Sequence, residues 1–241
     1  MGINNIWNAL TSENPELVTI ILHIAVFMES YLTLNLFLSI LNIESTRKQR
    51  ILYVLLFGVE GTLSSLFIPS PYNLIINYLI VFLIIYFIFK LKPLKVILCM
   101  ILPIIIFALI GSLIINPYLT LLNISYEQTE VIPIYRLGYL TIMYTIASLI
   151  IFIIKLKNIR LTILEDLDKN TKIIIFANLI LGFIVLCIQI FITVYYINIL
   201  PLLITFLNFI ALLSYFFIST YSLTRVTKLY KTQKQLENSE A

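Results

Sequence analysis

Long apolar stretches alternate with short polar segments along the whole chain. A run of about 18 or more apolar residues is typical of a transmembrane segment. Because lipid offers backbone groups no hydrogen-bond partner, such a segment is expected to be a helix. The pattern therefore predicts an all-α, polytopic membrane helix bundle with seven spans, at residues 18–41, 51–68, 72–89, 94–115, 134–154, 173–197 and 201–223.

Composition supports the membrane class. Hydrophobic residues make up 61% of the 241 positions, charged residues only 12%, and the mean hydropathy is +1.03. A soluble domain carries about twice that charged fraction. The first residues have no basic segment or small-residue cleavage site, so they do not resemble a signal peptide. Apolar residues at helical spacing predict instead a short interfacial helix at residues 2–11, with Trp7 at headgroup level.

Basic residues define the expected topology. All of the 16 Lys and Arg residues except Arg136 fall on connections that lie on one side if there are seven spans. Positive charge marks the cytoplasmic side of a membrane protein. We therefore expect the N-terminus outside, the C-terminus in the cytoplasm, and a multi-pass protein of a bacterial plasma membrane, whose partner is the lipid bilayer rather than nucleic acid.

Two carboxylates, Glu29 and Glu60, are expected near mid-depth of the first two spans. An acidic residue at a helix centre costs roughly 3 kcal/mol to insert, which makes each one a candidate site. In one interpretation they form a proton or ion site, or a polar hinge; in the other they make interhelical hydrogen bonds that fix the packing. Further polar residues within the spans are Asn35, Asn178, Gln189 and Asn208.

Candidate ligand contacts gather toward the expected outer side. His23 is the only histidine, and no second histidine or cysteine pairs with it, so the sequence predicts neither a metal site nor a catalytic pair and implies no cofactor. Arg136 is expected close to two acidic residues, either as a local ion pair or interfacial anchor, or as a contact for an anionic ligand group. The candidates are His23, Trp7, Tyr118, Glu127, Glu130 and Arg136.

The last predicted span runs without Gly or Pro into a basic, helix-compatible tail, TRVTKLYKTQKQLENSEA. The tail repeats apolar or amide positions with 3-4-3 spacing, at Val226, Leu229, Gln233 and Leu236. This spacing is typical of a two-helix contact, although a basic anchoring tail is the alternative. We therefore expect a transmembrane bundle over residues 1–223 and a cytoplasmic dimerisation helix over residues 224–241.

A polytopic bundle followed by FFISTYSLTRVTKLYKTQKQLENSEA resembles the membrane part of the AgrC-type peptide-pheromone sensor histidine kinases, whose catalytic part is a GHKL-type ATPase. The resemblance implies a homodimeric sensor that binds an extracellular peptide or small ligand and relays it to a kinase module or response regulator. The chain departs from that family in having no histidine after His23, so kinase activity requires a further module. The alternative function is a small-molecule or ion-coupled transporter, or its membrane subunit.

Overall fold

The computed structural model describes residues 3–68 and 72–158, and beyond them only the isolated positions Ala177, Leu181, Leu207, Ile210, Ala211, Ser214 and Thr232. The chain divides into two compact units, Met1–Ile159 and Arg160–Ala241. The first unit contains every helix discussed below. The described residues are helical and contain no strand, which confirms the all-α class for this part of the chain.

Helix α1 (Ile3–Thr11) leads into helix α2 (Pro15–Ile40) through a short break. The break follows from Asn14, which caps α2: its side chain accepts a hydrogen bond from the Leu17 backbone N–H, and Pro15 occupies the first helical turn. Both helices were expected, and α1 leaves Ile6 and Trp7 exposed on its surface.

The next long helices are α3 (Arg47–Phe67), α4 (Tyr72–Phe89), α5 (Pro93–Leu122) and α7 (Pro133–Leu156). A capping box of Thr46 and Gln49 starts α3. Among the described residues, α2, α3, α5 and α7 are long and apolar enough to cross a membrane, and α4 contains a shorter apolar segment, Ile76–Phe89. The apolar pattern thus predicted the positions of these helices well. Two further predicted spans, 173–197 and 201–223, lie outside the described residues.

The segment 116–133 differs from its prediction as an open outer connection. Helix α5 continues through Pro117 to Leu122, and a short helix, α6 (Tyr126–Val131), follows it. Proline removes one backbone donor but does not end a helix whose other bonds hold. The α5 helix ends instead at Asn123, which adopts the left-handed conformation at φ 53°. A capping box of Ser125 and Gln128 then starts α6.

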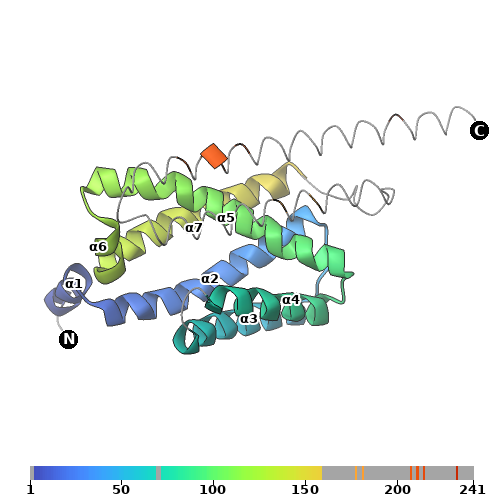
Figure 1. Cartoon of the computed structure of the whole chain (residues 1–241), viewed down its shortest axis with the longest axis horizontal. Helices are drawn as coiled ribbons and strands as arrows, with labels where there is room; N and C mark the ends of the chain where they lie inside the picture. Colours follow the sequence, from blue (N-terminus) through green and yellow to red (C-terminus); the bar gives the residue numbers. More distant parts are fainter. Residues whose placement is uncertain are drawn as a thin grey trace, which may run out of the picture. The chain divides into compact units, whose positions relative to one another are not determined.

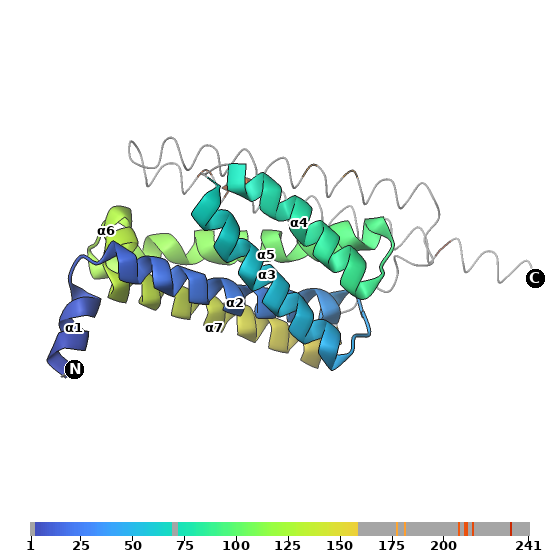
Figure 2. The ribbon, with the colours of Figure 1, turned by 90° about the horizontal axis from the view of Figure 1, so that it is seen from below.

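Within the first unit, the long helices make a closed ring. Helix α2 contacts α3, α3 contacts α4, α4 contacts α5, α5 contacts α7, and α7 returns to α2. Helices α2 and α5 also meet across the ring. Figure 1 shows α2 beside α3 and α7, and Figure 2 shows α3 and α4 as a hairpin over the same helices. Helix α2 thus contacts three of the other four long helices, α3, α5 and α7, and many of its side chains are buried.

Candidate functional site

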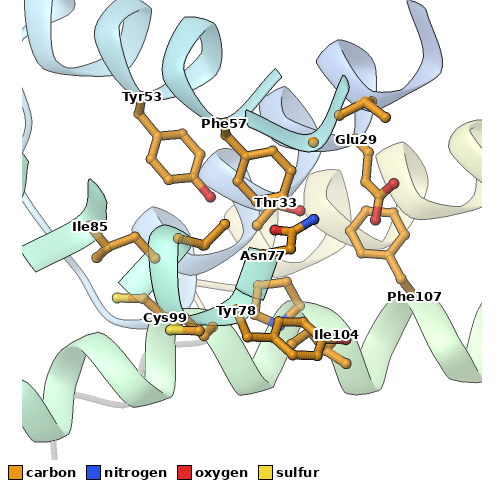
Figure 3. A pocket seen from close by; sticks show the side chains of 15 residues that line it. Glu29, Thr33, Tyr53, Phe57, Asn77, Tyr78, Ile85, Cys99, Ile104 and Phe107 are labelled. Carbon is orange, nitrogen blue, oxygen red and sulfur yellow. The ribbon is translucent and has the colours of Figure 1, made fainter. Parts of the chain in front are cut away.

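A cavity of about 290 Å³ lies between α2, α3, α4 and α5. Each helix contributes side chains at helical spacing, which places them on one face of that helix. Figure 3 shows these side chains converging on the space from all four helices. The lining residues are Val26, Glu29 and Thr33 from α2; Tyr53, Phe57 and Gly61 from α3; Asn77, Tyr78, Val81 and Ile85 from α4; and Cys99, Met100, Pro103, Ile104 and Phe107 from α5.

Helices α2 and α3 pack closely against each other at one wall of the cavity. A Cβ atom on Gly61 would lie 2.8 Å from Val26 Cγ1, and one on Gly58 would overlap the ring of Phe27. Only glycine lets two helices come this near at both positions. The two glycines therefore fix the position of α3 beside the part of α2 that carries Glu29.

The polar groups of the cavity have few partners. No hydrogen bond or ion pair joins the Glu29 carboxyl group to another residue in the described part of the chain. The Tyr53 hydroxyl is buried there and also lacks a hydrogen-bond partner. Thr33 and Asn77 add a hydroxyl and an amide to the lining, whose described residues include no Lys, Arg or His. An unpaired polar group within a membrane costs free energy, so these groups are available to a ligand.

Contacts between aromatic rings hold Tyr53 in place at its side of the cavity. Its ring is 5.5 Å from that of Phe37 in a T-shaped contact and 5.7 Å from that of Phe57, measured between centroids. Phe37 also meets Phe89 at 5.6 Å. Phe37 and Tyr53 are fully buried. This aromatic cluster holds Tyr53 in place, with its hydroxyl directed toward the cavity (Figure 3).

Glu29 is about halfway along α2, roughly 21 Å from Pro15 at 1.5 Å per residue. Glu29 and Glu60 were expected either to form a shared polar site or to make interhelical hydrogen bonds. Glu60 is not among the described residues that line the cavity. Both Glu60 carboxylate oxygens are buried and have no hydrogen-bond partner among the described residues. Of the two glutamates, Glu29 brings its carboxyl group to the cavity. Asn35 lies elsewhere, where its amide donates to the Tyr31 carbonyl and accepts from Lys155.

His23 lies in a second, more open hollow of about 260 Å³, between α2 and α3. Its Nε2 atom is 3.4 Å from the Ser65 hydroxyl oxygen. The remaining lining is mainly apolar, from Ile20, Ile24, Phe27, Val59 and Leu63, with Thr62 as a further polar residue. His23 therefore has a hydroxyl neighbour that spacing alone did not indicate. No group of three metal-ligating side chains occurs among the described residues.

The other outer candidates do not form one site. Trp7 is exposed on α1, and Glu127 and Glu130 are exposed on α6. Tyr118 is buried, and its hydroxyl donates to the Tyr135 carbonyl at 2.6 Å.

Arg136 forms no ion pair with Glu127 or Glu130 among the described residues, so the first of its expected roles is not seen there. Its Nε atom is buried without a hydrogen-bond partner in the described part. The predicted residues Asn178, Gln189, Asn208, Val226, Leu229, Gln233 and Leu236 lie outside the described residues.

Sequence reasoning singled out Glu29 but missed the residues that surround it, above all Tyr53, Phe57, Asn77 and Phe107. A weak indication was present: Tyr53, Phe57 and Gly61 repeat at four-residue steps, and Asn77 is a lone amide within an apolar run. Such a pattern fits an ordinary packed face equally well. Compared with family models, curated proteins and solved structures, the chain matches none.

Proposed function

We propose that this protein is a multi-pass membrane receptor module that detects a small extracellular ligand inside its helix bundle. The observation that carries the proposal is the cavity between α2, α3, α4 and α5. It holds the Glu29 carboxyl group, for which no hydrogen bond is found among the described residues, and the Tyr53 hydroxyl, which is buried there without a partner. Ligand sites are typically concave, mostly apolar and furnished with a few polar groups. The cavity fits a small solute, or one side chain of a peptide, rather than a whole peptide.

Helix α2 offers a route for relaying the bound state. On one side it lines the cavity; on the other it packs against α7, where the Tyr144 hydroxyl donates to the Ala25 carbonyl at 3.1 Å. A ligand that binds one position of α2 better than another shifts that equilibrium, and α7 responds through this contact. We propose seven spans with the N-terminus outside, so that the shift passes through residues 201–223 to a dimeric helix at 224–241 and on to a cytoplasmic kinase module or response regulator.

Cysteine crosslinking tests the relay. Val226→Cys is placed in a Cys187→Ser background that keeps Cys99, which lines the cavity and is fully buried, and the protein is reconstituted in liposomes. A panel of small amino acids, amines and sugars is added, and the yield of disulfide-linked dimer is measured. We expect at least one solute to change the yield, and Thr33→Trp, which fills the cavity, to abolish that response.

An unchanged yield with every solute contradicts the receptor function. Glu237→Cys, at the far end of the same segment, serves as the control for nonspecific crosslinking.

A second candidate, an ion-coupled transporter or its membrane subunit, is favoured by the unpaired carboxyl group of Glu29 at mid-depth. Intramembrane carboxyl groups often carry protons or ions in transporters. The same liposomes, preloaded with a pH-sensitive dye, report solute-driven proton movement. Transport that is lost in Glu29→Gln and retained in Glu16→Gln supports this candidate. Solute binding with no flux supports the receptor instead.

A further inference from the structure

We propose that the cavity recognises a small organic cation, an ammonium-bearing solute held between the Glu29 carboxylate and a set of aromatic rings. This inference rests on the proposed function, because it takes the cavity as the ligand site and names the chemical class of its ligand. The inference starts from the composition of the cavity lining. One carboxyl group and four aromatic side chains surround the same space: Tyr53, Phe57, Tyr78 and Phe107.

The charge of the lining selects a cation. Among the described lining residues, Glu29 is the only carboxylic acid, and none is Lys, Arg or His. A negative charge taken out of water is stable only when it is paired or solvated by dipoles. Since no described residue pairs with the Glu29 carboxyl group, a positively charged ligand supplies the missing partner. An anionic ligand meets no positive group there and is excluded.

The aromatic side chains select an organic ammonium group. Tyr53 and Phe57 come from α3, Tyr78 from α4 and Phe107 from α5, so rings line the cavity from three helices (Figure 3). The electron-rich faces of aromatic rings attract cations, and quaternary ammonium groups are recognised in proteins by such sets of rings. Phe107 from α5 and Glu29 from α2 line the same cavity, so that a ring and the carboxyl group face one space.

The size of the cavity argues against a bare metal ion. Its volume of about 290 Å³ corresponds to the liquid volume of roughly ten water molecules at about 30 Å³ each. An inorganic ion would leave most of this space to water against apolar walls formed by Val81, Ile85 and Ile104. A small organic cation fills the space, contacts those walls with its methyl or methylene groups, and leaves Thr33 and Asn77 to bind a hydroxyl or amino group.

Choline and its uncharged isostere 3,3-dimethyl-1-butanol test the proposal directly. Binding of radiolabelled choline to the full chain in nanodiscs is measured by scintillation proximity, with the isostere, NaCl and KCl as competitors. We expect choline to bind at least about tenfold more tightly than the isostere, because only choline carries the charge. We expect Glu29→Gln to weaken choline binding about tenfold or more and to leave the affinity for the isostere unchanged.

Matched variants separate chemistry from folding. Glu16→Gln removes a carboxyl group from the first turn of α2, outside the cavity, and is expected to bind choline normally. Glu29→Asp keeps the charge and is expected to keep the preference for choline. Phe107→Leu is expected to weaken choline binding about fivefold, whereas Phe87→Leu, at a 69% exposed position, leaves it unchanged.

Equal binding of the isostere and choline overturns the cationic class, as does full competition by an equal concentration of Na⁺ or K⁺. Absence of choline binding to the wild-type chain also overturns it. The receptor function is tested separately by the Val226→Cys crosslinking. If that yield responds to a different solute while choline fails to bind, the cation proposal is wrong and the receptor proposal stands; if it responds to none, the receptor proposal fails as well.

Discussion

Helix α2 presents two different environments, one toward α7 and one toward the cavity. Toward α7, Ile21 and Ala25 pack against Leu140 in an apolar cluster, and the Tyr144 hydroxyl there is satisfied by the Ala25 carbonyl. Toward α3, α4 and α5, Glu29 faces a cavity and the Tyr53 hydroxyl has no partner in the described part.

Both sides contain polar groups, but among the described residues the Glu29 carboxyl group and the Tyr53 hydroxyl on the cavity side have no hydrogen-bond partner. In lipid an unpaired polar group costs free energy that a packed apolar side chain does not. The packing toward α7 therefore favours stability. On the cavity side these two groups lower stability, and the ligand proposed above would supply their missing partner. The following substitutions test this contrast.

The largest effect is expected from adding bulk to each side of α2. Ala25 and Thr33 are equally buried, at 8% and 7% exposure, but only Thr33 lines the cavity. Ala25→Leu forces side-chain carbons into the cluster with Leu140 and is expected to cost about 3 kcal/mol of unfolding free energy. Thr33→Leu extends into empty space and is expected to cost less than about 1 kcal/mol. Unfolding by SDS titration in mixed micelles, followed by circular dichroism, measures both. Equal losses would show that the cavity side is as tightly packed as the α7 side.

The second-largest loss of unfolding free energy is expected where α2 and α3 pack closely together. Gly58→Ala places a methyl group where the Phe27 ring lies, and we expect a loss of about 2 kcal/mol because a ring has few ways to move aside. Gly111→Ala is the matched control. Its added Cβ lies 3.1 Å from the Tyr139 hydroxyl, the end of a side chain that can shift. The same SDS titration compares them, and a larger loss at Gly111 contradicts the assignment of α2 and α3 as the closely packed pair.

The sequence was sufficient for the helices and insufficient for the cavity. Apolar runs predicted α2, α3, α4, α5 and α7 to within a few residues at most ends, because hydrophobic length is a local property. The exception was the C-terminal end of α5, since the predicted span ended at residue 115 and the helix ends at Leu122. The helix passes through Pro117 and is capped by Asn123, whose left-handed backbone was not indicated by the apolar pattern.

Glu29 was identified because a carboxyl group in an apolar run is conspicuous. Its neighbours Tyr53, Asn77 and Phe107 come from three other helices, and which faces of those helices meet is a property of the whole packing. The same limit explains Glu60. Sequence position gave Glu29 and Glu60 a similar expected depth, but depth carries no information on rotation about the helix axis, and Glu60 is not among the described residues of the cavity lining.

A matched pair of tyrosines gives a smaller and more specific effect. Tyr144→Phe removes a hydroxyl that donates to the Ala25 carbonyl, and we expect a loss of about 1 kcal/mol. Tyr53→Phe removes a buried hydroxyl without a partner in the described part, and we expect stability to stay equal or to rise slightly, since no hydrogen bond is lost. Both are measured by the same SDS titration. A loss in Tyr53→Phe equal to that in Tyr144→Phe would show that the Tyr53 hydroxyl is satisfied, which breaks the contrast between the two sides of α2.

The smallest effect is expected where α2 and α7 meet near their C-terminal ends. There the Lys155 ammonium group donates to the Asn35 side-chain oxygen at 3.0 Å. Lys155→Met and Asn35→Leu, alone and together, form a double-mutant cycle whose coupling energy we expect to be about 0.5 kcal/mol, since Lys155 is exposed. The cycle is run by SDS titration with and without 100-fold excess choline over its dissociation constant. If α2 carries the bound state to α7, the coupling changes when the cavity is filled; a coupling that is the same in both conditions places the relay elsewhere on α2.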